Sequence, residues 1–245
     1  MSPARKGARG AKRATKRTST PPKRAAAPSR TILVVDVGGT HIKLRGSDWA
    51  EVTRIDSGMH MGPTQMVAAV REVLEGRRYD VVAMGYPGVV RGGAPAEEPV
   101  NLGPGWVGFD YSAAFGTPVR TINDAAMQAL GNYADGNMLF IGFGTGMGSA
   151  LVTPHDVLPL ELAHAPYRKG RTYEEYVGAA GRERMGDHKW ERHCLRVATI
   201  LRDALQATDV VLGGGNAKRL HQIPDGMRLG APDAAFLGGL QLWQR

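Results

Sequence analysis

Continuous apolar runs recur along the chain from residue 31 onward. Three of them have the length of a buried strand, namely TILVVD (31–36), VVAMGY (81–86) and MLFIGF (138–143). A fourth run, DVVLGGG (209–215), leads directly into glycines. Short apolar runs that are closed by turn residues are typical of strands buried on both faces. The pattern therefore predicts four buried strands.

Helical periodicity appears between these runs. One face after Gly62 carries Met66, Val70, Val73 and Leu74, and Gly76 ends the pattern. Further helices are expected over 123–133, over 172–184 and from about 234 onward, and Asn216 could open another as its cap. The longest amphipathic pattern places six apolar side chains on one face: Trp190, Cys194, Val197, Ala198, Leu201 and Leu205. Cys194 is thus expected to be a core residue rather than a reactive thiol.

Two segments resemble each other. DVGGTHIKL (36–44) and GFGTGMGSAL (142–151) each consist of the end of a strand, a glycine-rich turn and a returning strand. They lie in opposite halves of the chain. We expect an N-terminal α/β half-domain over 31–122 and a C-terminal one over 123–245, with the last helix able to pack back on the N-terminal half. Each half would offer its glycine hairpin to a common cleft.

Charge separates residues 1–30 from the rest. This segment holds ten Lys or Arg side chains and no Asp or Glu, whereas the remaining residues hold 21 basic and 23 acidic ones. It has no Val, Leu, Ile or aromatic residue, so we expect a disordered basic tail. A solvated extension, nonspecific binding of nucleic acid and capture of polyphosphate are all compatible with it.

Composition excludes several other classes of protein. The single cysteine excludes a disulfide framework and a multi-cysteine zinc site. No apolar run approaches the roughly 20 residues of a membrane span, so no membrane association is expected. The basic start is followed by no apolar signal region, which favours a cytoplasmic protein.

The glycine turns are the first candidates for chemistry, because backbone N–H groups in such turns can cradle phosphate oxygens. A dinucleotide-binding loop must lead into a helix, whereas the turns at 38–40 and 144–148 lead into expected strands. The G-x-x-x-x-G-K-[ST] phosphate loop is absent as well. A single glycine turn can be only a turn, but three in one chain, each at the end of an apolar strand, favour phosphate binding.

In order and spacing, a series of short motifs resembles the ROK family of sugar kinases, within the actin/hexokinase/Hsp70 superfamily. The motifs are Asp36-Val37-Gly38-Gly39-Thr40 with Lys43, Gly85-Tyr86-Pro87-Gly88, Asn101-Leu102 with Trp106, Asn123-Asp124, Gly144-Thr145-Gly146-Met147-Gly148, Glu161-Leu162-Ala163-His164, Glu174-Glu175-Tyr176-Val177 and Gly213-Gly214-Gly215. The match covers most of residues 31–245.

The resemblance implies a two-domain, ribonuclease-H-like α/β fold of the actin/hexokinase type, with duplicated half-domains around a cleft. It implies phosphoryl transfer from polyphosphate or ATP, with Mg²⁺, to the 6-hydroxyl of glucose, and a homodimer. The sugar would be bound by Pro87, Gly88, Asn101, Asn123, Asp124, Glu161, His164 and Glu174. Phosphate or nucleotide would be bound by Asp36, Gly38, Gly39, Thr40, Lys43, Gly144, Thr145, Gly146, Gly148, Gly213, Gly214 and Gly215.

Three features depart from the common family pattern. The cysteines that bind structural zinc in the family are missing, so no zinc is expected. The second phosphate motif ends in GSA rather than GGG, as in the polyphosphate glucokinase branch, which also lacks those cysteines. Ala163 replaces the glycine of the Glu-x-Gly-His motif.

Asp124 is the expected catalytic base, since a sugar hydroxyl must lose its proton during transfer. The alternative is that Asn123 and Asp124 only cap the helix that follows. Asp36 would hold Mg²⁺ through water, or would simply form a turn. Lys43 would contact phosphate, or would be an exposed strand lysine.

The other sugar-site candidates leave alternatives open. Glu161 and His164 could share one ligand, or His164 could be structural. Glu175 is as plausible by spacing as Glu174. Two rival functions also remain: an ATP-dependent kinase for another hexose, and a sugar-sensing regulator whose tail binds nucleic acid nonspecifically. The regulator is disfavoured because residues 1–30 lack the apolar residues of a helix-turn-helix.

Overall fold

The computed structural model describes residue 1 and residues 30–244. The basic tail predicted for residues 1–30 therefore lies almost wholly outside the described residues. The first of two five-stranded sheets has the order β3-β2-β1-β4-β7. Its strands are β1 (Ile32–Val37), β2 (His41–Gly46), β3 (Thr53–Asp56), β4 (Val81–Tyr86) and β7 (Val119–Asn123).

The second sheet repeats this arrangement in the order β10-β9-β8-β13-β14. It is formed by β8 (Met138–Phe143), β9 (Met147–Val152), β10 (Val157–Leu160), β13 (Asp209–Gly213) and β14 (Met227–Leu229). In each sheet the first three strands in sequence pair antiparallel, and the next two join parallel to the first. The predicted duplication of a strand–turn–strand unit is thus observed.

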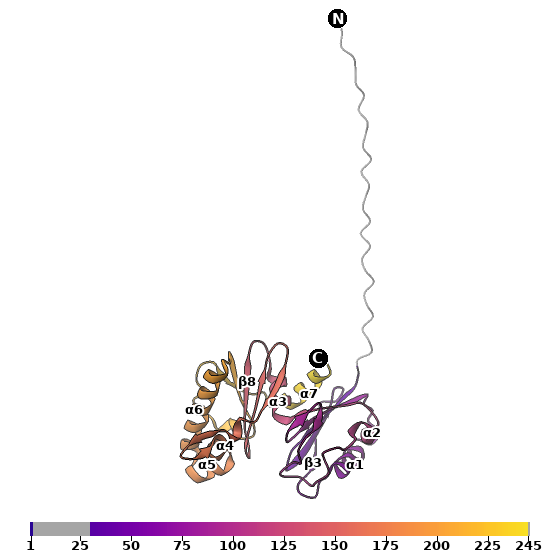
Figure 1. Cartoon of the computed structure of the whole chain (residues 1–245). Helices are drawn as coiled ribbons and strands as arrows, with labels where there is room; N and C mark the ends of the chain where they lie inside the picture. The colour runs from indigo at the N-terminus through magenta and orange to yellow at the C-terminus, as the bar shows by residue number, and fades with distance from the viewer. Residues whose placement is uncertain (2–29, 245) are drawn as a thin grey trace.

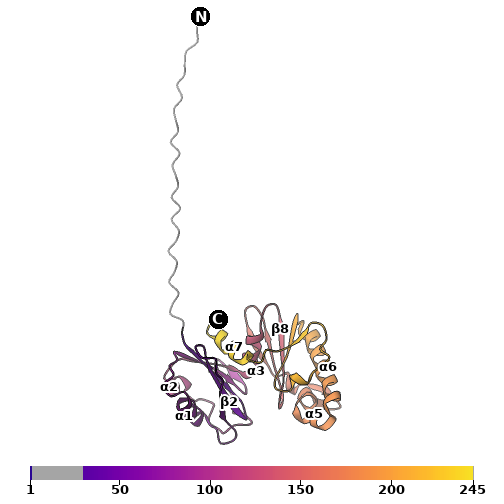
Figure 2. The ribbon, with the colours of Figure 1, turned by 180° about the vertical axis from the view of Figure 1, so that it is seen from behind.

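Helices cover both faces of the two sheets (Figures 1 and 2). The outer helices are α1 (Pro63–Val73) and α2 (Tyr111–Phe115) on the first half, and α4 (Tyr173–Val177), α5 (Ala179–Met185) and α6 (Asp187–Leu205) on the second. Between the sheets lie α3 (Asp124–Asn132) and α7 (Ala234–Leu242). Short elements complete the fold: β5 (Val90–Arg91), β6 (Ala94–Pro95), β11 (Pro166–Arg168), β12 (Arg171–Thr172) and the 3₁₀ turns η1 (Leu162–His164) and η2 (Ala217–Arg219).

Side-chain alternation explains how the first sheet carries a layer on each face. Leu33 and Val35 of β1 pack in one core with Met66 of α1. Val34, whose side chain points to the opposite face, packs in another core with Phe236 of α7. All six residues of β1 are buried, which accounts for the continuous apolar run in the sequence.

The last helix, α7, lies against the first sheet although it follows the second sheet in sequence. Trp243 donates its indole N–H to the carbonyl of Val82 at 3.1 Å. Helices α3 and α7 also touch directly, since a Cβ on Gly131 would overlap the backbone of Ala234. These two helices therefore connect the halves.

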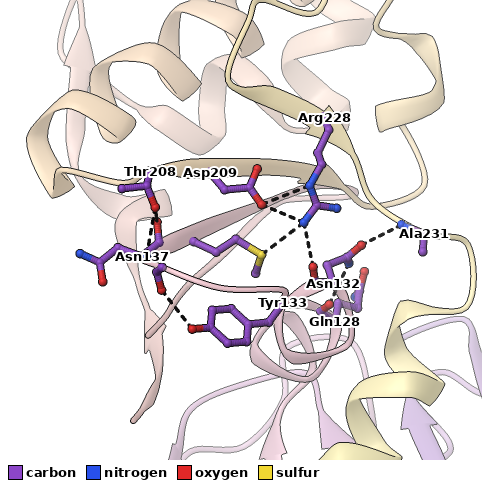
Figure 3. Close-up of polar contacts among 10 residues, drawn as sticks. Gln128, Asn132, Tyr133, Asn137, Thr208, Asp209, Arg228 and Ala231 are labelled. Carbon is purple, nitrogen blue, oxygen red and sulfur yellow. Dashed lines mark hydrogen bonds and ion pairs between the residues drawn. The ribbon is translucent and has the colours of Figure 1, made fainter. Parts of the chain in front are cut away.

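Arg228 anchors the end of α3 to the second sheet (Figure 3). Its guanidinium donates to Asp209 Oδ2 at 2.8 and 3.1 Å and to the carbonyl of Asn132 at 2.8 Å. The amide oxygen of Asn132 accepts from Ala231 N at 2.8 Å, just before α7 begins. The segment that returns to the first half is thus held to α3.

Two helix predictions need correction. Val73 was expected on the buried face of α1, but it is 43% exposed, and Val67 takes its place at 5%. The single helix expected over 172–184 is divided at Gly178 into α4 and α5. Gly178 lies so close to the carbonyl of Thr145 that a Cβ would be 2.8 Å from that oxygen, so contact with the second glycine loop breaks the helix.

The core prediction for Cys194 is confirmed. Its side chain is fully buried in the core between α6 and the second sheet, and this burial raises the pKa of the thiol. Within the described residues, no helix combines the length and apolarity required to cross a bilayer.

Candidate active site

Asn123 and Asp124 lie where β7 passes into α3, at the junction of the two halves. Asn123 is the N-cap, and its side-chain oxygen accepts from Ala126 N at 3.0 Å. Its amide nitrogen donates to the carbonyl of Gly88 at 3.1 Å, which brings the predicted sugar loop Pro87-Gly88 to the start of α3. The capping role thus belongs to Asn123.

The carboxylate of Asp124 has an unusual electrostatic setting. Burial raises its pKa from 3.8 to about 7, and the negative charges of Asp36 and Glu161 add to the rise. A hydrogen bond from Ala125 N, at 2.7 Å, acts in the opposite direction. The charges of the three predicted site carboxylates therefore interact with one another.

The first glycine turn follows Asp36 at the end of β1. Lys43 of β2 lies 3.2 Å from Asp36 Oδ2, so the Lys43 ammonium is paired with this carboxylate. A Cβ on Gly39 would be 2.9 Å from Cβ of Asn101, so the turn packs directly on the predicted sugar-binding residue. Thr40 is exposed.

The second glycine turn, 144–148, packs against the start of α3, where Gly148 meets Ala125 closely enough to exclude a Cβ. Glu174 holds this turn, because its carboxylate accepts from Met147 N at 3.1 Å. Glu175, by contrast, forms a capping box with Thr172 at the start of α4. The structure thus distinguishes two glutamates that spacing left equivalent.

The third glycine turn, 213–215, lies beside the second because β13 pairs with β8. Gly214 has φ +81°, a conformation that favours glycine. Asn216 occupies the N-cap position of η2 but makes no capping hydrogen bond with its side chain. That side chain instead donates to the carbonyl of Gly144 at 3.1 Å and accepts from Arg182 at 2.5 Å. The predicted capping role of Asn216 is therefore wrong.

Glu161 and His164 lie together at η1, with Nε2 of His164 3.8 Å from Oε2 of Glu161. Both side chains are exposed, at 54% and 72%. Ala163 between them is buried in the second core. A pair that is exposed and close to Asp124 can meet a ligand at the junction.

Two residues of this region were missed by sequence reasoning. Glu98 accepts from the backbone N–H groups of Gly105, Trp106 and Val107 at 2.9 to 3.1 Å, and these hydrogen bonds, above all that from Val107, lower its pKa. It thereby fixes the loop that carries Asn101. Arg182 is the other, and nothing in its local sequence marks it.

The predicted residues thus gather around the start of α3, the two glycine hairpins and the third turn. In the described part of the chain, no group of three or more His, Cys, Asp or Glu side chains could hold a metal ion. Two cavities, of about 280 and 440 Å³, lie elsewhere: one between β2 and α7, the other beside α6. Neither is lined by a predicted site residue.

Comparison with known proteins gives a consistent picture. No family model matches the sequence. Polyphosphate glucokinase of Mycobacterium tuberculosis (strain H37Rv) is 25% identical over 234 residues, which covers 82% of this chain and 85% of that protein. Polyphosphate glucokinase of Mycobacterium leprae is also 25% identical, with 84% and 70% covered.

Solved structures share the fold. The inorganic polyphosphate/ATP-glucomannokinase from Arthrobacter sp. strain KM has a TM-score of 0.72 at 24% identity and covers 89% of this chain and 100% of its own. A ROK family glucokinase from Streptomyces griseus, in complex with glucose and AMPPNP, has a TM-score of 0.68 at 15% identity, with 86% and 98% covered. The predicted fold class and the resemblance to ROK sugar kinases near the polyphosphate glucokinase branch are both confirmed.

Proposed function

We propose that this relative of the polyphosphate glucokinases, with the fold of the ROK sugar kinases, is a hexose kinase. It transfers a phosphoryl group from polyphosphate, ATP or both to the 6-hydroxyl of glucose. The observation that carries the proposal is the setting of Asp124, a carboxylate with a raised pKa at the junction of the halves, next to the second glycine hairpin.

Asp124 acts as the general base in this proposal. A carboxylate whose pKa is raised to about 7 is a better proton acceptor than an ordinary aspartate. Asn123 does the capping, so Asp124 is free for the sugar hydroxyl. Phosphoryl transfer otherwise depends on positioning and charge stabilisation.

The sugar is bound from both halves. Pro87, Gly88 and Asn101 approach from the first half, and Glu161 and His164 approach from the second. Carboxylate, amide and imidazole groups suit a ligand whose hydroxyls both donate and accept hydrogen bonds. Closure of the two halves would exclude water, which is a competing acceptor.

The donor is bound by the backbone N–H groups of the three glycine turns. Mg²⁺ would be held through water by Asp36, whose carboxylate lies near the end of β1 directly before the first glycine turn. Mg²⁺ commonly uses only one or two carboxylates and keeps several waters. The ion would neutralise charge on the transferred group. Lys43 orients Asp36 in the absence of the donor.

Two properties belong to the same proposal. A cytoplasmic location agrees with a single cysteine that is a buried thiol, as is usual in reducing compartments. Assembly into a homodimer remains a prediction from the resemblance.

The test is hexose phosphorylation measured in a coupled assay, with ATP and with polyphosphate supplied separately. Glucose and mannose are compared as acceptors, each with Mg²⁺ and with a chelator. Turnover of glucose with either donor supports the proposal, and the ratio of kcat/KM values assigns the donor. Turnover only with another hexose would correct the acceptor, and the absence of transfer to any hexose would refute the function.

A further inference from the structure

Two arginines share one carboxylate at the outer side of the second half. Nε of Arg182, in α5, is 3.2 Å from Oδ1 of Asp187, and Nη1 of Arg219, in η2, is 3.2 Å from Oδ2 of the same residue. One carboxylate cannot neutralise two guanidiniums, so this cluster keeps a net positive charge. We call Arg182 and Arg219 the guanidinium pair.

The guanidinium pair is connected to the donor turns. Nη1 of Arg182 donates to Oδ1 of Asn216 at 2.5 Å, and Nδ2 of Asn216 donates to the carbonyl of Gly144 at 3.1 Å. Arg219 N donates to the carbonyl of Asn216 at 3.0 Å. Both arginines therefore lie next to the residue that links the second and third glycine turns.

Part of the hydrogen-bonding capacity of the guanidinium pair is unused. Among the described residues, Nε of Arg219 is a buried donor without any hydrogen-bond partner. The side chains of Arg182 and Arg219 are 23% and 41% exposed, so a ligand can reach both. A buried unpaired donor on a charged group is costly, and the exposed part of the same Arg219 side chain is available to a ligand anion.

Open space lies beside the pair. A cavity of about 440 Å³ begins at Asp187 and continues along α6 past His188, Glu191 and His221. A donor that enters the glycine turns and extends beyond Asn216 would meet the guanidinium pair before this cavity.

We propose that Arg182 and Arg219 form a subsite for the phosphate units of polyphosphate that lie beyond the three that ATP also carries, and that this subsite favours polyphosphate over ATP. The inference rests on the proposed kinase function. A planar guanidinium offers paired N–H groups that match phosphate oxygens, and every further unit of polyphosphate carries such oxygens. Adenosine, which occupies the corresponding part of ATP, is uncharged and gains little from the net positive charge.

Arg219→Gln is the main test variant, because it removes the charge and the unpaired Nε donor. Arg202→Gln is the matched control: Arg202 also pairs with a carboxylate, Asp203 at 2.9 Å, but it lies near the far end of α6, roughly 20 Å away along the helix. Arg219→Lys keeps the charge and loses the planar fork. All variants are made in the full chain, so residues 1–30 contribute equally to each.

Binding of long polyphosphate is measured by calorimetry at low and high salt, with tripolyphosphate, which has no more units than ATP, as the control ligand, together with KM for long polyphosphate and for ATP. For Arg219→Gln we expect affinity for long polyphosphate to fall about tenfold or more, as for the loss of a charge-assisted hydrogen bond, and affinity for tripolyphosphate to change much less. KM for polyphosphate should rise similarly, with a much smaller change for ATP. Added salt should reduce the difference in affinity between wild type and Arg219→Gln. The affinity of Arg219→Lys should lie between those of wild type and Arg219→Gln.

Each outcome decides the matter. Equal affinity of wild type and Arg219→Gln for long polyphosphate overturns the subsite, whatever the kinase assay gives. An equal loss in Arg202→Gln also overturns it, since the effect would then be one of general charge. An equal rise of KM for ATP and polyphosphate would make Arg219 a support of the turns rather than a selector. If wild type transfers no phosphoryl group to glucose but still binds polyphosphate more tightly than Arg219→Gln does, only the kinase proposal is refuted.

Discussion

Asp124→Asn should have opposite effects on activity and on stability. Asparagine keeps the shape of the side chain and removes its charge, so the base is lost while the packing remains. We expect kcat to fall by about 10² to 10⁴, the usual contribution of a general base. The protein should at the same time become more stable near and above neutral pH, because an unfavourable buried charge is removed.

The size of the stability effect follows from the pKa of Asp124. In the folded protein it is about 7, against 3.8 for an ordinary aspartate. A rise of about three units corresponds to a ceiling of about 4 kcal/mol. Asp124 is partly exposed, so solvent screening reduces this, and we expect about 1 to 2 kcal/mol.

The sign of the pH dependence is fixed by the same values. Because the folded pKa lies above the unfolded one, the group's contribution is fully present below about pH 4 and is lost as the pH rises through about 7. Wild type should therefore lose stability relative to Asp124→Asn across this window. In the free enzyme kcat/KM should rise with pH through about 7, as Asp124 becomes ionised.

Urea unfolding at about pH 4 and pH 8, combined with the kinase assay, measures both effects. Asp110→Asn is the matched control, since Asp110 caps α2 with a hydrogen bond from Ala113 N at 2.9 Å and lies outside the candidate site. Asparagine is an equally good cap, so this variant should keep its activity and stability. Parallel pH dependence of wild type and Asp124→Asn would refute the electrostatic argument. Retention of more than about a tenth of kcat would refute the assignment of the base.

Three further predictions concern the site and the tail. Glu174→Gln can still accept a hydrogen bond from Met147 N and should keep kcat within about threefold of wild type, whereas Glu174→Ala should lower kcat about tenfold or more. Equal rises in KM for glucose in both variants would instead make Glu174 a direct sugar ligand. Gly39→Ala should raise KM for glucose several-fold and cost about 1 to 3 kcal/mol of stability, because the new methyl group displaces Asn101; unchanged kinetics would separate this contact from sugar binding. Removal of residues 1–30 should leave kcat with ATP unchanged and raise KM for long polyphosphate at low salt; an effect that persists at high salt would not be electrostatic.

Local sequence was sufficient to predict the positions of the buried strands. The run at 31–36 predicts a strand that the structure has as Ile32–Val37, and the runs at 81–86 and 138–143 coincide with β4 and β8. These strands have both faces covered, so nearly every position is apolar, and Asp36 in β1 is the charged exception. The turn that follows Asp36 was equally clear, because glycines interrupt two strands that pair with each other.

Contacts between segments that are distant in the chain could not be predicted from local sequence. Gly178 interrupts a helical pattern because it meets Thr145, which is 33 positions earlier in the chain. Asn216 is of a residue type that is common at helix N-caps, but its side chain forms hydrogen bonds with Gly144 and Arg182 instead. Only the pairing of β8 with β13 brings these residues together, and no local pattern reports that pairing.

The balance of charge also connects the separate proposals. Asp36 and Glu161 raise the pKa of Asp124, and residues 31–245 carry a net charge of −2. The negative charges around Asp124 would repel polyphosphate, which is a strong polyanion, but not a neutral sugar. We therefore expect cations to accompany the donor at each stage: residues 1–30 when polyphosphate first binds, the guanidinium pair at the outer units, and Mg²⁺ at the transferred group. Coulomb interactions weaken with salt most strongly where charges are exposed, so rising salt should impair encounter first, the subsite next and transfer last.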